Sequence, residues 1–266
     1  MPNPEGTPIW YELMTADPDA SKAFYDDVIG WTVEAQPSGE MDYRMIGTNG
    51  EGGSGGGMVG GVMRLTADMQ SHGAKPTWLF YIGVNDVDAS VEKIKAEGGS
   101  VLVPAWDIPG TGRIAMVADP QGIPFYVMRG ASDESSTAFD RTGMGKCNWN
   151  ELTTTDQAGA NAFYATVFGW TYPDTMSMGP AGDYVFVQAG DQTIGATMNA
   201  RADGEPVGWR FYFRAPDIEE AAAKVTKNGG TVHAGPMDVP GGDRIIVASD
   251  THGVMFGVVG PGNQGE

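Results

Sequence analysis

Apolar side chains recur at helical spacing in four short stretches of the chain. In the first stretch, Ala20, Phe24 and Val28 lie on one face of a predicted helix. Asp17 before them is a favoured N-cap residue, and Gly30 after them is a favoured stop. The same pattern begins again at Asp86, Asp156 and Asp217. The sequence therefore predicts four short amphipathic helices.

Between these helices, apolar and polar residues alternate with the period of two that is typical of strands. The runs DYRMIG, MVGGVMRL, RIAMVAD and IPFYVMRG are examples. One such run precedes each predicted helix and further runs follow it. The pattern therefore predicts a βαβββ unit that occurs four times, and an α+β fold class.

The two halves of the chain are copies of one another. ELMTADPDASKAFYDDVIGWT at residues 12–32 matches ELTTTDQAGANAFYATVFGWT at residues 151–171, position for position. Trp78 and Trp209 begin a second pair of matching segments. We therefore predict two domains of two units each, at residues 1–130 and 145–266. The polar residues 131–144 between them are expected to be a linker.

The stretch NGEGGSGGGMVGG at residues 49–61 contains the pattern GxGxxG. A dinucleotide-binding loop of this kind needs a strand before it and a helix that opens on its last glycine. Here the β-like run MVGGVMRL follows, and copy two shortens the segment to about AGDQTIG. We therefore predict an elongated hairpin tip and not a phosphate site.

Charge and composition exclude several classes of partner. Sixteen Lys and Arg residues against 34 Asp and Glu residues leave a formal charge of −18, which repels nucleic acid and anionic membranes. No apolar run approaches the ~20 residues of a membrane span, and the first residues do not resemble a signal peptide. We expect a cytoplasmic protein with neither partner. The single cysteine, Cys147, permits no intrachain disulfide and is expected to be a buried strand residue.

The βαβββ units, the segment DPDASKAFY followed by GW, and the DPQG turn resemble the vicinal oxygen chelate superfamily. That superfamily includes glyoxalase I, bleomycin-resistance proteins and extradiol dioxygenases. The motifs WxEL, GW and DxPGxxR are similar to those of tandem glyoxalase-like proteins that are often labelled as hydroxylases. The resemblance implies two glyoxalase-like domains with bowl-shaped mixed sheets. It also implies a metal held by the first strand of each unit and by the final strand.

The positions that carry the metal ligands in this superfamily hold other residue types here. They are Trp10, Leu79 and Tyr126 in copy one, and Trp149, Arg210 and Gly257 in copy two. Metals of this class take imidazole or carboxylate ligands, and indole, alkyl and guanidinium groups offer no usable lone pair. His72, His233 and His252 lie elsewhere in the chain. We therefore expect no metal bound in the family's usual way, and no cofactor.

Period-two alternation places aromatic and acidic side chains on the inner face of each predicted bowl. In copy one these are Trp10, Glu12, Tyr81 and Tyr126, and in copy two they are Trp149, Glu151, Arg210 and Tyr212. The pattern predicts an aromatic-lined cavity with one carboxylate, which suits a small organic ligand. The alternative is that the rings only fill the core of the bowl.

The two carboxylates, Glu12 and Glu151, are the candidate catalytic residues. A buried carboxylate must be paired, hydrated or protonated. Copy two offers Arg210 and Arg214 on the facing strand, so an ion pair with Glu151 is expected. Copy one has no arginine at the matching positions, which makes Glu12 the better candidate for a general base. The alternatives for Glu12 are an ion pair with Arg44 or Arg113, or exposure to solvent at the rim.

Three functions follow as hypotheses. The favoured one is a non-enzymatic protein that binds an apolar, aromatic or cationic organic molecule in a metal-free bowl, as bleomycin-resistance relatives do. The second is a cofactor-independent lyase, isomerase, hydrolase or hydroxylase with Glu12 or Glu151 as general base. The third is a metal-dependent glyoxalase or dioxygenase. The sequence leaves open whether the protein is an enzyme, and whether it is a monomer or a homodimer.

Overall fold

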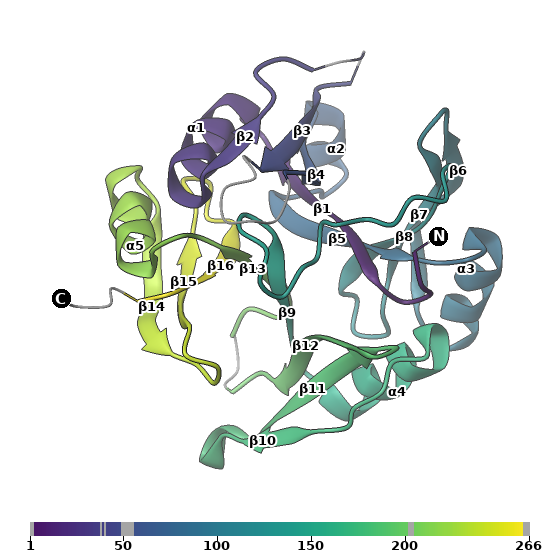
Figure 1. Cartoon of the computed structure of the whole chain (residues 1–266). Helices are drawn as coiled ribbons and strands as arrows, with labels where there is room; N and C mark the ends of the chain where they lie inside the picture. The colour runs from purple at the N-terminus through teal and green to yellow at the C-terminus, as the bar shows by residue number, and fades with distance from the viewer. Residues whose placement is uncertain (1–2, 38, 40, 49–55, 202–204, 263–266) are drawn as a thin grey trace. The chain divides into compact units, whose positions relative to one another are not determined.

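The computed structural model describes residues 3–37, 39, 41–48, 56–201 and 205–262. Copy one contains β1 (Pro8–Thr15), α1 (Pro18–Ile29), β2 (Trp31–Val33), β3 (Tyr43–Thr48), β4 (Met58–Arg64), α2 (Ala67–Ser71), β5 (Thr77–Gly83), α3 (Val87–Ala96), β6 (Ser100–Ile108), β7 (Gly112–Ala118) and β8 (Pro124–Gly130). Copy two contains β9 (Cys147–Thr154), α4 (Gln157–Phe168), β10 (Thr175–Ser177), the 3-10 helix η1 (Gly179–Ala181), β11 (Asp183–Ala189), β12 (Gln192–Asn199), β13 (Gly208–Arg214), α5 (Ile218–Lys227), β14 (Thr231–Asp238), β15 (Arg244–Ser249) and β16 (Met255–Gly260). Figure 1 shows these elements with the same labels.

The described strands form two mixed sheets of eight strands, one from each half of the chain. Their orders are β2-β3-β4-β1-β5-β8-β7-β6 and β10-β11-β12-β9-β13-β16-β15-β14. In both sheets the first strand of the copy runs parallel to the last strand of its own unit, as β1 does with β4 and β9 with β12. The predicted α+β class and the fourfold βαβββ pattern are confirmed.

The four predicted helix starts are also confirmed. The side chains of Asp17, Asp86, Asp156 and Asp217 each accept a hydrogen bond from a backbone N–H of the first turn. Gly30 and Gly169 end α1 and α4 with φ angles of 82° and 72°. Glycine adopts this left-handed conformation without the steric penalty of a side chain, which explains why it closes both helices.

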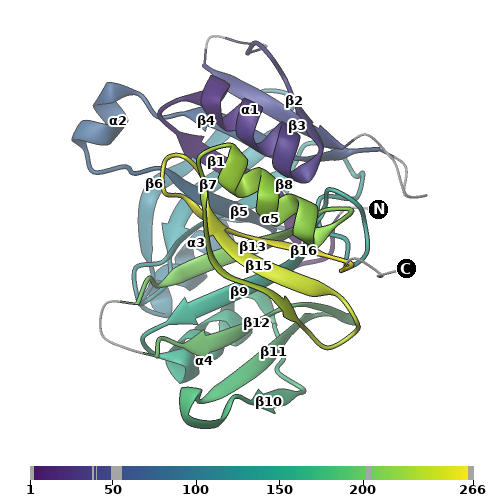
Figure 2. The same cartoon turned by 90° about the vertical axis from the view of Figure 1, so that its left-hand side faces the viewer.

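The chain divides into two compact units, and each unit takes elements from both copies. The first unit comprises Met1–Ile9, Leu79–Ser136 and Trp149–Trp209, and the second comprises Trp10–Trp78, Thr137–Asn148 and Arg210–Glu266. The first unit therefore holds α3 and α4, and the second holds α1 and α5, which lie side by side (Figure 2). The domain boundaries at residues 1–130, 131–144 and 145–266 stay a prediction.

The core of the second unit contains a hydrogen-bonded chain of three buried side chains. Tyr25 on α1 accepts a hydrogen bond from Nε1 of Trp78 at 3.0 Å and donates one to Oδ2 of Asp250 at 3.1 Å. Phe256 packs edge-on against the Tyr25 ring at 5.2 Å. Burial raises the pKa of Tyr25 well above its usual value, and the charge of Asp250 adds to this effect. The phenol is therefore a neutral donor that bridges copy one to copy two.

The first unit repeats this arrangement with the copies exchanged. Tyr164 on α4 accepts a hydrogen bond from Nε1 of Trp209 at 3.0 Å and donates one to Oδ2 of Asp119 at 3.2 Å. Asp119 belongs to the DPQG turn, and its Oδ1 accepts the backbone N–H of Gln121 and of Ile123 at 2.9 Å each. Burial raises the pKa of Asp119. In each unit, the aspartate of a turn from one copy thus accepts a hydrogen bond from a tyrosine of the other copy.

The strands on either side of the glycine-rich segment pair antiparallel, from Tyr43↔Met63 to Gly47↔Met58. The β-like run that was expected after the glycines is β4, so the segment does not open a helix as a dinucleotide fingerprint requires. Residues 49–55, which include the predicted hairpin tip, lie outside the described residues. Cys147 is fully buried at the start of β9, as expected. None of the described helices has the length and apolar character needed to cross a membrane.

Candidate functional site

Copy two brings three side chains together across its first strands. Trp149 and Glu151 lie on β9, and Tyr184 lies on β11, which is separated from β9 by β12. Nε1 of Trp149 donates a hydrogen bond to the Tyr184 hydroxyl at 2.7 Å, and this hydroxyl donates to Oε2 of Glu151 at 2.9 Å. Glu151 is 7% exposed, whereas both rings are half-buried. We call Trp149, Tyr184 and Glu151 the copy-two site.

Copy one places the matching residues on β1 and β3. Nε1 of Trp10 donates a hydrogen bond to the Tyr43 hydroxyl at 2.8 Å. Glu12 is 1% exposed and pairs in register with Gly61 on β4, just as Glu151 pairs with Ala196 on β12. We call Trp10, Tyr43 and Glu12 the copy-one site. The same strand order therefore builds the same indole–phenol contact twice.

The two sites differ in the residues that surround the tyrosine. In copy one, the Tyr43 ring lies directly over Gly61, because a Cβ atom at residue 61 would be 2.3 Å from the phenol oxygen. In copy two the corresponding residue is Ala196. Copy two also adds the ring of Phe186, which packs edge-on against Trp149 at 5.9 Å and Tyr184 at 5.7 Å.

The other predicted ligand-binding residues occupy β5, β8 and β13. Tyr81 and Tyr126 are paired in register in the first unit, and their rings stack at 4.3 Å with an interplanar angle of 16°. Arg210 and Tyr212 lie on β13 in the second unit. The Tyr212 ring covers Gly257, where a Cβ atom would be 2.2 Å from Cδ1 of the tyrosine. Trp10 and Glu12 thus belong to the same compact unit as Arg210 and Tyr212. Trp149 and Glu151 belong to the same unit as the stacked tyrosines.

Arg44 and Arg113, the arginines expected as alternative partners of Glu12, bind other carboxylates. Arg113 binds Asp88 at 2.8 Å and Asp107 at 3.1 Å. Arg44 binds Asp19 in the first turn of α1 and Asp42, which directly precedes β3. Because Glu12 is only 1% exposed, the alternative that it opens to solvent at the rim is wrong. The two expected ion pairs of Glu12, with Arg44 and with Arg113, are therefore also wrong, because each arginine binds aspartates instead.

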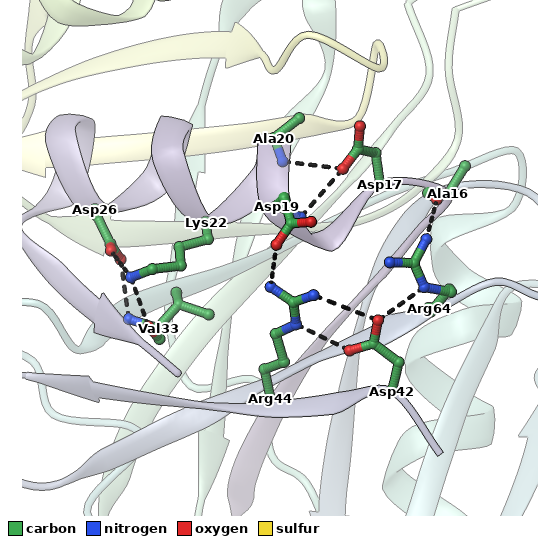
Figure 3. A network of polar contacts seen from close by, with 10 residues as sticks. All are labelled: Ala16, Asp17, Asp19, Ala20, Lys22, Asp26, Val33, Asp42, Arg44 and Arg64. Carbon is green, nitrogen blue, oxygen red and sulfur yellow. Dashed lines mark hydrogen bonds and ion pairs between the residues drawn. The ribbon is translucent and has the colours of Figure 1, made fainter. Parts of the chain in front are cut away.

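Arg44 lies at the centre of a network of ion pairs that joins β3 to the start of α1 (Figure 3). Its Nε binds Asp42 at 2.9 Å and its Nη1 binds Asp19 at 2.6 Å, while Nε of Arg64 binds Asp42 at 2.7 Å. The hydrogen bond from Arg44 lowers the pKa of Asp42 below its usual value, and the bond to Asp42 raises the pKa of Arg44. Asp42 therefore contributes stability that is present above its unfolded pKa and is lost as pH falls through its folded pKa. Because Asp42 and Arg44 flank Tyr43, the network holds this part of β3 in place.

Arg214, one of the two arginines expected near Glu151, binds elsewhere. Its Nη1 and Nη2 atoms bind the carboxylate of Asp243 at 2.7 and 2.8 Å, and Nη1 also donates to Oδ1 of Asn148 at 3.2 Å. This two-pronged geometry is the strong form of an arginine–carboxylate pair. Arg210 and Glu151 belong to different compact units, so their expected ion pair stays a prediction.

The side chains at the family's metal positions do not fit a divalent metal. The indole N–H groups of Trp10 and Trp149 are hydrogen-bond donors to tyrosines, and an indole has no lone pair for a metal. Leu79, Tyr126, Arg210 and Gly257 supply no imidazole and no carboxylate. Within the part of the chain that the structure describes, no group of three His, Cys, Asp or Glu residues is placed to hold a metal ion.

Sequence reasoning missed three residues of the site, namely Tyr43, Tyr184 and Phe186. The available signal was the matching runs DYRMIG and DYVFVQ, in which an Asp-Tyr pair opens the third strand of each copy. Period-two alternation places Tyr184 and Phe186 on one face of β11. That the face is the one shared with Trp149 depends on strand order, which the runs alone do not contain.

Replacing Gly61 by alanine is expected to move Tyr43 away from Trp10 at a small cost in stability. The new methyl group would lie 2.3 Å from Cε1, Cζ and the oxygen of Tyr43, which form the free end of a flexible side chain. The ring can therefore shift, so we expect a loss near the lower end of the about 1–3 kcal/mol typical of overpacking. Near-ultraviolet circular dichroism and chemical denaturation measure the two effects. An unchanged aromatic spectrum would show that Tyr43 does not lie on Gly61.

Comparison with known proteins places these sites in a family context. The family model described as the Glyoxalase/Bleomycin resistance protein/Dioxygenase superfamily matches residues 8–127 and 146–258. The chain is 35% identical over 262 residues to the protein named "Putative glyoxylase CFP32" of Mycobacterium tuberculosis (strain CDC 1551 / Oshkosh), covering 98% of this chain and 97% of that protein. It is 30% identical over 271 residues to the anthracycline biosynthesis protein DauV of Streptomyces sp. (strain C5), covering 96% and 93%.

Among solved structures, the Mn(II)-bound glyoxalase from Novosphingobium aromaticivorans is similar, with a TM-score of 0.67. The alignment covers 96% of this chain and 82% of that chain at 17% identity. A likeness at this identity concerns the fold alone. The metal in its name is that structure's own.

Proposed function

Because the chain belongs to the glyoxalase/bleomycin resistance protein/dioxygenase superfamily, we propose that it binds a small organic molecule with an apolar or aromatic surface at its copy-one and copy-two sites. In this proposal, binding requires no metal. The biological role of the protein is sequestration of the ligand or resistance to it. Membership of the superfamily supports the fold on which the sites are built. The side chains of the two sites support the proposed class of ligand.

The hydrogen-bonded chain from Trp149 through Tyr184 to Glu151 is the observation that carries this proposal. Half-buried rings provide apolar contact area, and a carboxylate beside them provides a directional acceptor. Ligand sites typically combine such a surface with a few placed polar groups. A relative named for anthracycline biosynthesis agrees with an organic molecule as the ligand class.

The test is a thermal-shift screen of small aromatic and apolar compounds. A compound at 100 times its dissociation constant is expected to stabilise the protein by about 2.7 kcal/mol. The stabilisation should shrink in Tyr43→Leu or Tyr184→Leu, which remove the phenol of one site each. Leu102→Ala is the control, because this side chain is 49% exposed on β6. A screen in which no compound responds to either tyrosine substitution would contradict the proposal.

A second function, general-base catalysis without a cofactor, is favoured by the burial of Glu12. Glu12 is 1% exposed and shares a face of β1 with Trp10, which is a setting suited to proton transfer with a bound carbon acid or hydroxyl. In such an enzyme, Glu12→Gln is expected to lower kcat by about 10²–10⁴-fold. In a binding protein, the same variant should keep its affinity for a neutral ligand. Glu151→Gln is the matched variant in copy two.

Metal-dependent chemistry is the remaining alternative, and it can be tested directly. Protein prepared without chelator and then offered Mn²⁺, Fe²⁺, Ni²⁺ and Zn²⁺ is expected to retain much less than one metal ion per chain, because the side chains at the family's positions are not metal ligands. One equivalent of metal that is lost in Glu12→Gln would contradict the metal-free proposal.

A further inference from the structure

Three rings of copy two form a partly exposed aromatic face. Trp149 and Tyr184 each pack edge-on against Phe186, at centroid distances of 5.9 and 5.7 Å. All three side chains are half-buried, in contrast to the buried rings of Phe125, Phe168 and Trp170 around Tyr164 in the same unit. We call these three residues the copy-two aromatic face. Its rings are fixed by mutual contacts, and part of their surface remains accessible.

The polar atoms of this face are directed toward one another. The indole N–H of Trp149 is donated to Tyr184, and the hydroxyl hydrogen of Tyr184 is donated to Glu151. These two donors are therefore engaged within the site, and the half-buried rings are the surface that remains for a ligand. Ring faces carry negative potential and attract cations within about 6 Å of the ring centre.

The segment that contains these rings is also negatively charged. Between Cys147 and Ala200 the chain contains no Lys, Arg or His residue. Its acidic residues are Glu151, Asp156, Asp174, Asp183 and Asp191. The four aspartates are exposed, and Asp183 directly precedes Tyr184. Together with a formal charge of −18 for the whole chain, this segment attracts cationic ligands and repels anionic ones.

The matching segment of copy one, residues 8–65, is also acidic, with nine Asp and Glu residues, but it contains three basic residues, and its site has one ring fewer. Met45 stands on β3 where Phe186 stands on β11, so the third ring is absent there. Lys22, Arg44 and Arg64 also lie in that segment. Arg44 and Arg64 both bind Asp42, directly beside Tyr43. The two sites of the proposed function therefore differ in the number of rings and in the arginine–aspartate pairs next to the tyrosine in sequence.

From the ring geometry and this charge distribution, we propose that the copy-two aromatic face recognises an organic cation, namely a small molecule with a quaternary or protonated amine. The inference rests on the proposed function, and it names the ligand class of one of its two sites. The ammonium group lies over the rings of Trp149, Tyr184 and Phe186, and the exposed aspartates increase its local concentration. The copy-one site, with Met45 in place of the third ring, serves neutral ligands.

The test compares choline with its neutral analogue 3,3-dimethylbutan-1-ol, which has the same shape without the charge. Isothermal titration calorimetry on the full chain is expected to show binding of choline, with the alcohol about tenfold weaker or more. Phe186→Met copies the residue of copy one and should weaken choline binding about threefold or more. The matched control, Met45→Leu in copy one, should leave choline binding unchanged. Raising the salt concentration should weaken choline binding and not that of the alcohol.

Each outcome bears on the inference in a defined way. If the alcohol binds as tightly as choline, and Phe186→Met weakens both, the cation preference is wrong while the proposed function stands. If choline does not bind, or if Met45→Leu weakens it as much as Phe186→Met does, the inference is overturned. If in addition no compound of the thermal-shift screen responds to Tyr184→Leu, the proposed function fails at copy two as well. Circular dichroism shows whether Phe186→Met is folded. If it is not folded, the reciprocal variant Met45→Phe provides the test, because it is expected to add a second choline site at copy one.

Discussion

Replacing Tyr164 by alanine is expected to lower the free energy of unfolding by about 3–5 kcal/mol. The side chain is fully buried, and its ring packs against Trp170 at 4.9 Å and Trp209 at 5.6 Å. The substitution leaves a cavity and removes the partner of the Trp209 indole N–H and of Oδ2 of Asp119. Because small proteins are stable by only about 5–15 kcal/mol, a loss of this size is a large fraction of the total.

Chemical denaturation followed by tryptophan fluorescence measures this loss, and Tyr164→Phe separates its two causes. The phenylalanine keeps the ring and removes the hydroxyl, so we expect a loss of about 1–3 kcal/mol from the unpaired buried groups alone. Tyr25→Phe in the second unit should behave alike, because Tyr25 makes the same two hydrogen bonds to Trp78 and Asp250. If Tyr164→Phe and the unsubstituted protein have the same free energy of unfolding, these hydrogen bonds make no net contribution to stability.

Replacing Gly60 by alanine is expected to cost about 3 kcal/mol or more, at the upper end of the range for overpacking. A Cβ atom at residue 60 would lie 1.7 Å from the backbone oxygen of Tyr11 and 2.7 Å from its carbonyl carbon. Gly60 and Tyr11 are paired in register between β4 and β1, so no change of rotamer relieves the overlap. The two strands must separate, and with them Trp10 and Glu12 move from their positions in the copy-one site.

Gly61→Ala is the matched control for this prediction, since it adds the same methyl group one residue further along β4. There the overlap is with the end of the Tyr43 ring and not with backbone. The second copy supports the distinction, because glycine stands at position 195, where a Cβ atom would lie 1.8 Å from the Asn150 oxygen, whereas alanine stands at position 196. Similar losses for the two variants in denaturation experiments would contradict the proposed close approach of β1 and β4.

Because the copies exchange elements, the tyrosine substitutions also test how the units recognise one another. Each compact unit contains a tyrosine from one copy that donates to an aspartate from the other, Tyr25 to Asp250 and Tyr164 to Asp119. A buried donor and acceptor that satisfy each other favour one arrangement over alternatives that would leave both unpaired. The two bonds therefore specify which units pack together, in addition to their contribution to stability.

Several properties of this protein follow from its sequence alone, because they depend on neighbours within one turn or one strand. Asp17 and Asp156 cap helices through backbone N–H groups two or three residues away, so their role is visible in a short window. Alternation along β1 and β9 places Trp10 with Glu12, and Trp149 with Glu151, wherever these strands lie. The residue types at the family's metal positions are also read directly, and they indicate an aromatic site.

Only the tertiary structure decided which of these groups meet. Tyr43 lies 33 residues from Trp10, and Tyr184 lies 35 residues from Trp149, so their contacts depend on β4 and β12 being inserted between the strands that carry them. Arg44 lies on β3 and binds Asp42, which directly precedes this strand, although the sequence offered Glu12 as an equally charged partner. The chemistry of a side chain is a local property, whereas its partner is set by strand order and helix packing, because these bring distant segments within hydrogen-bond reach.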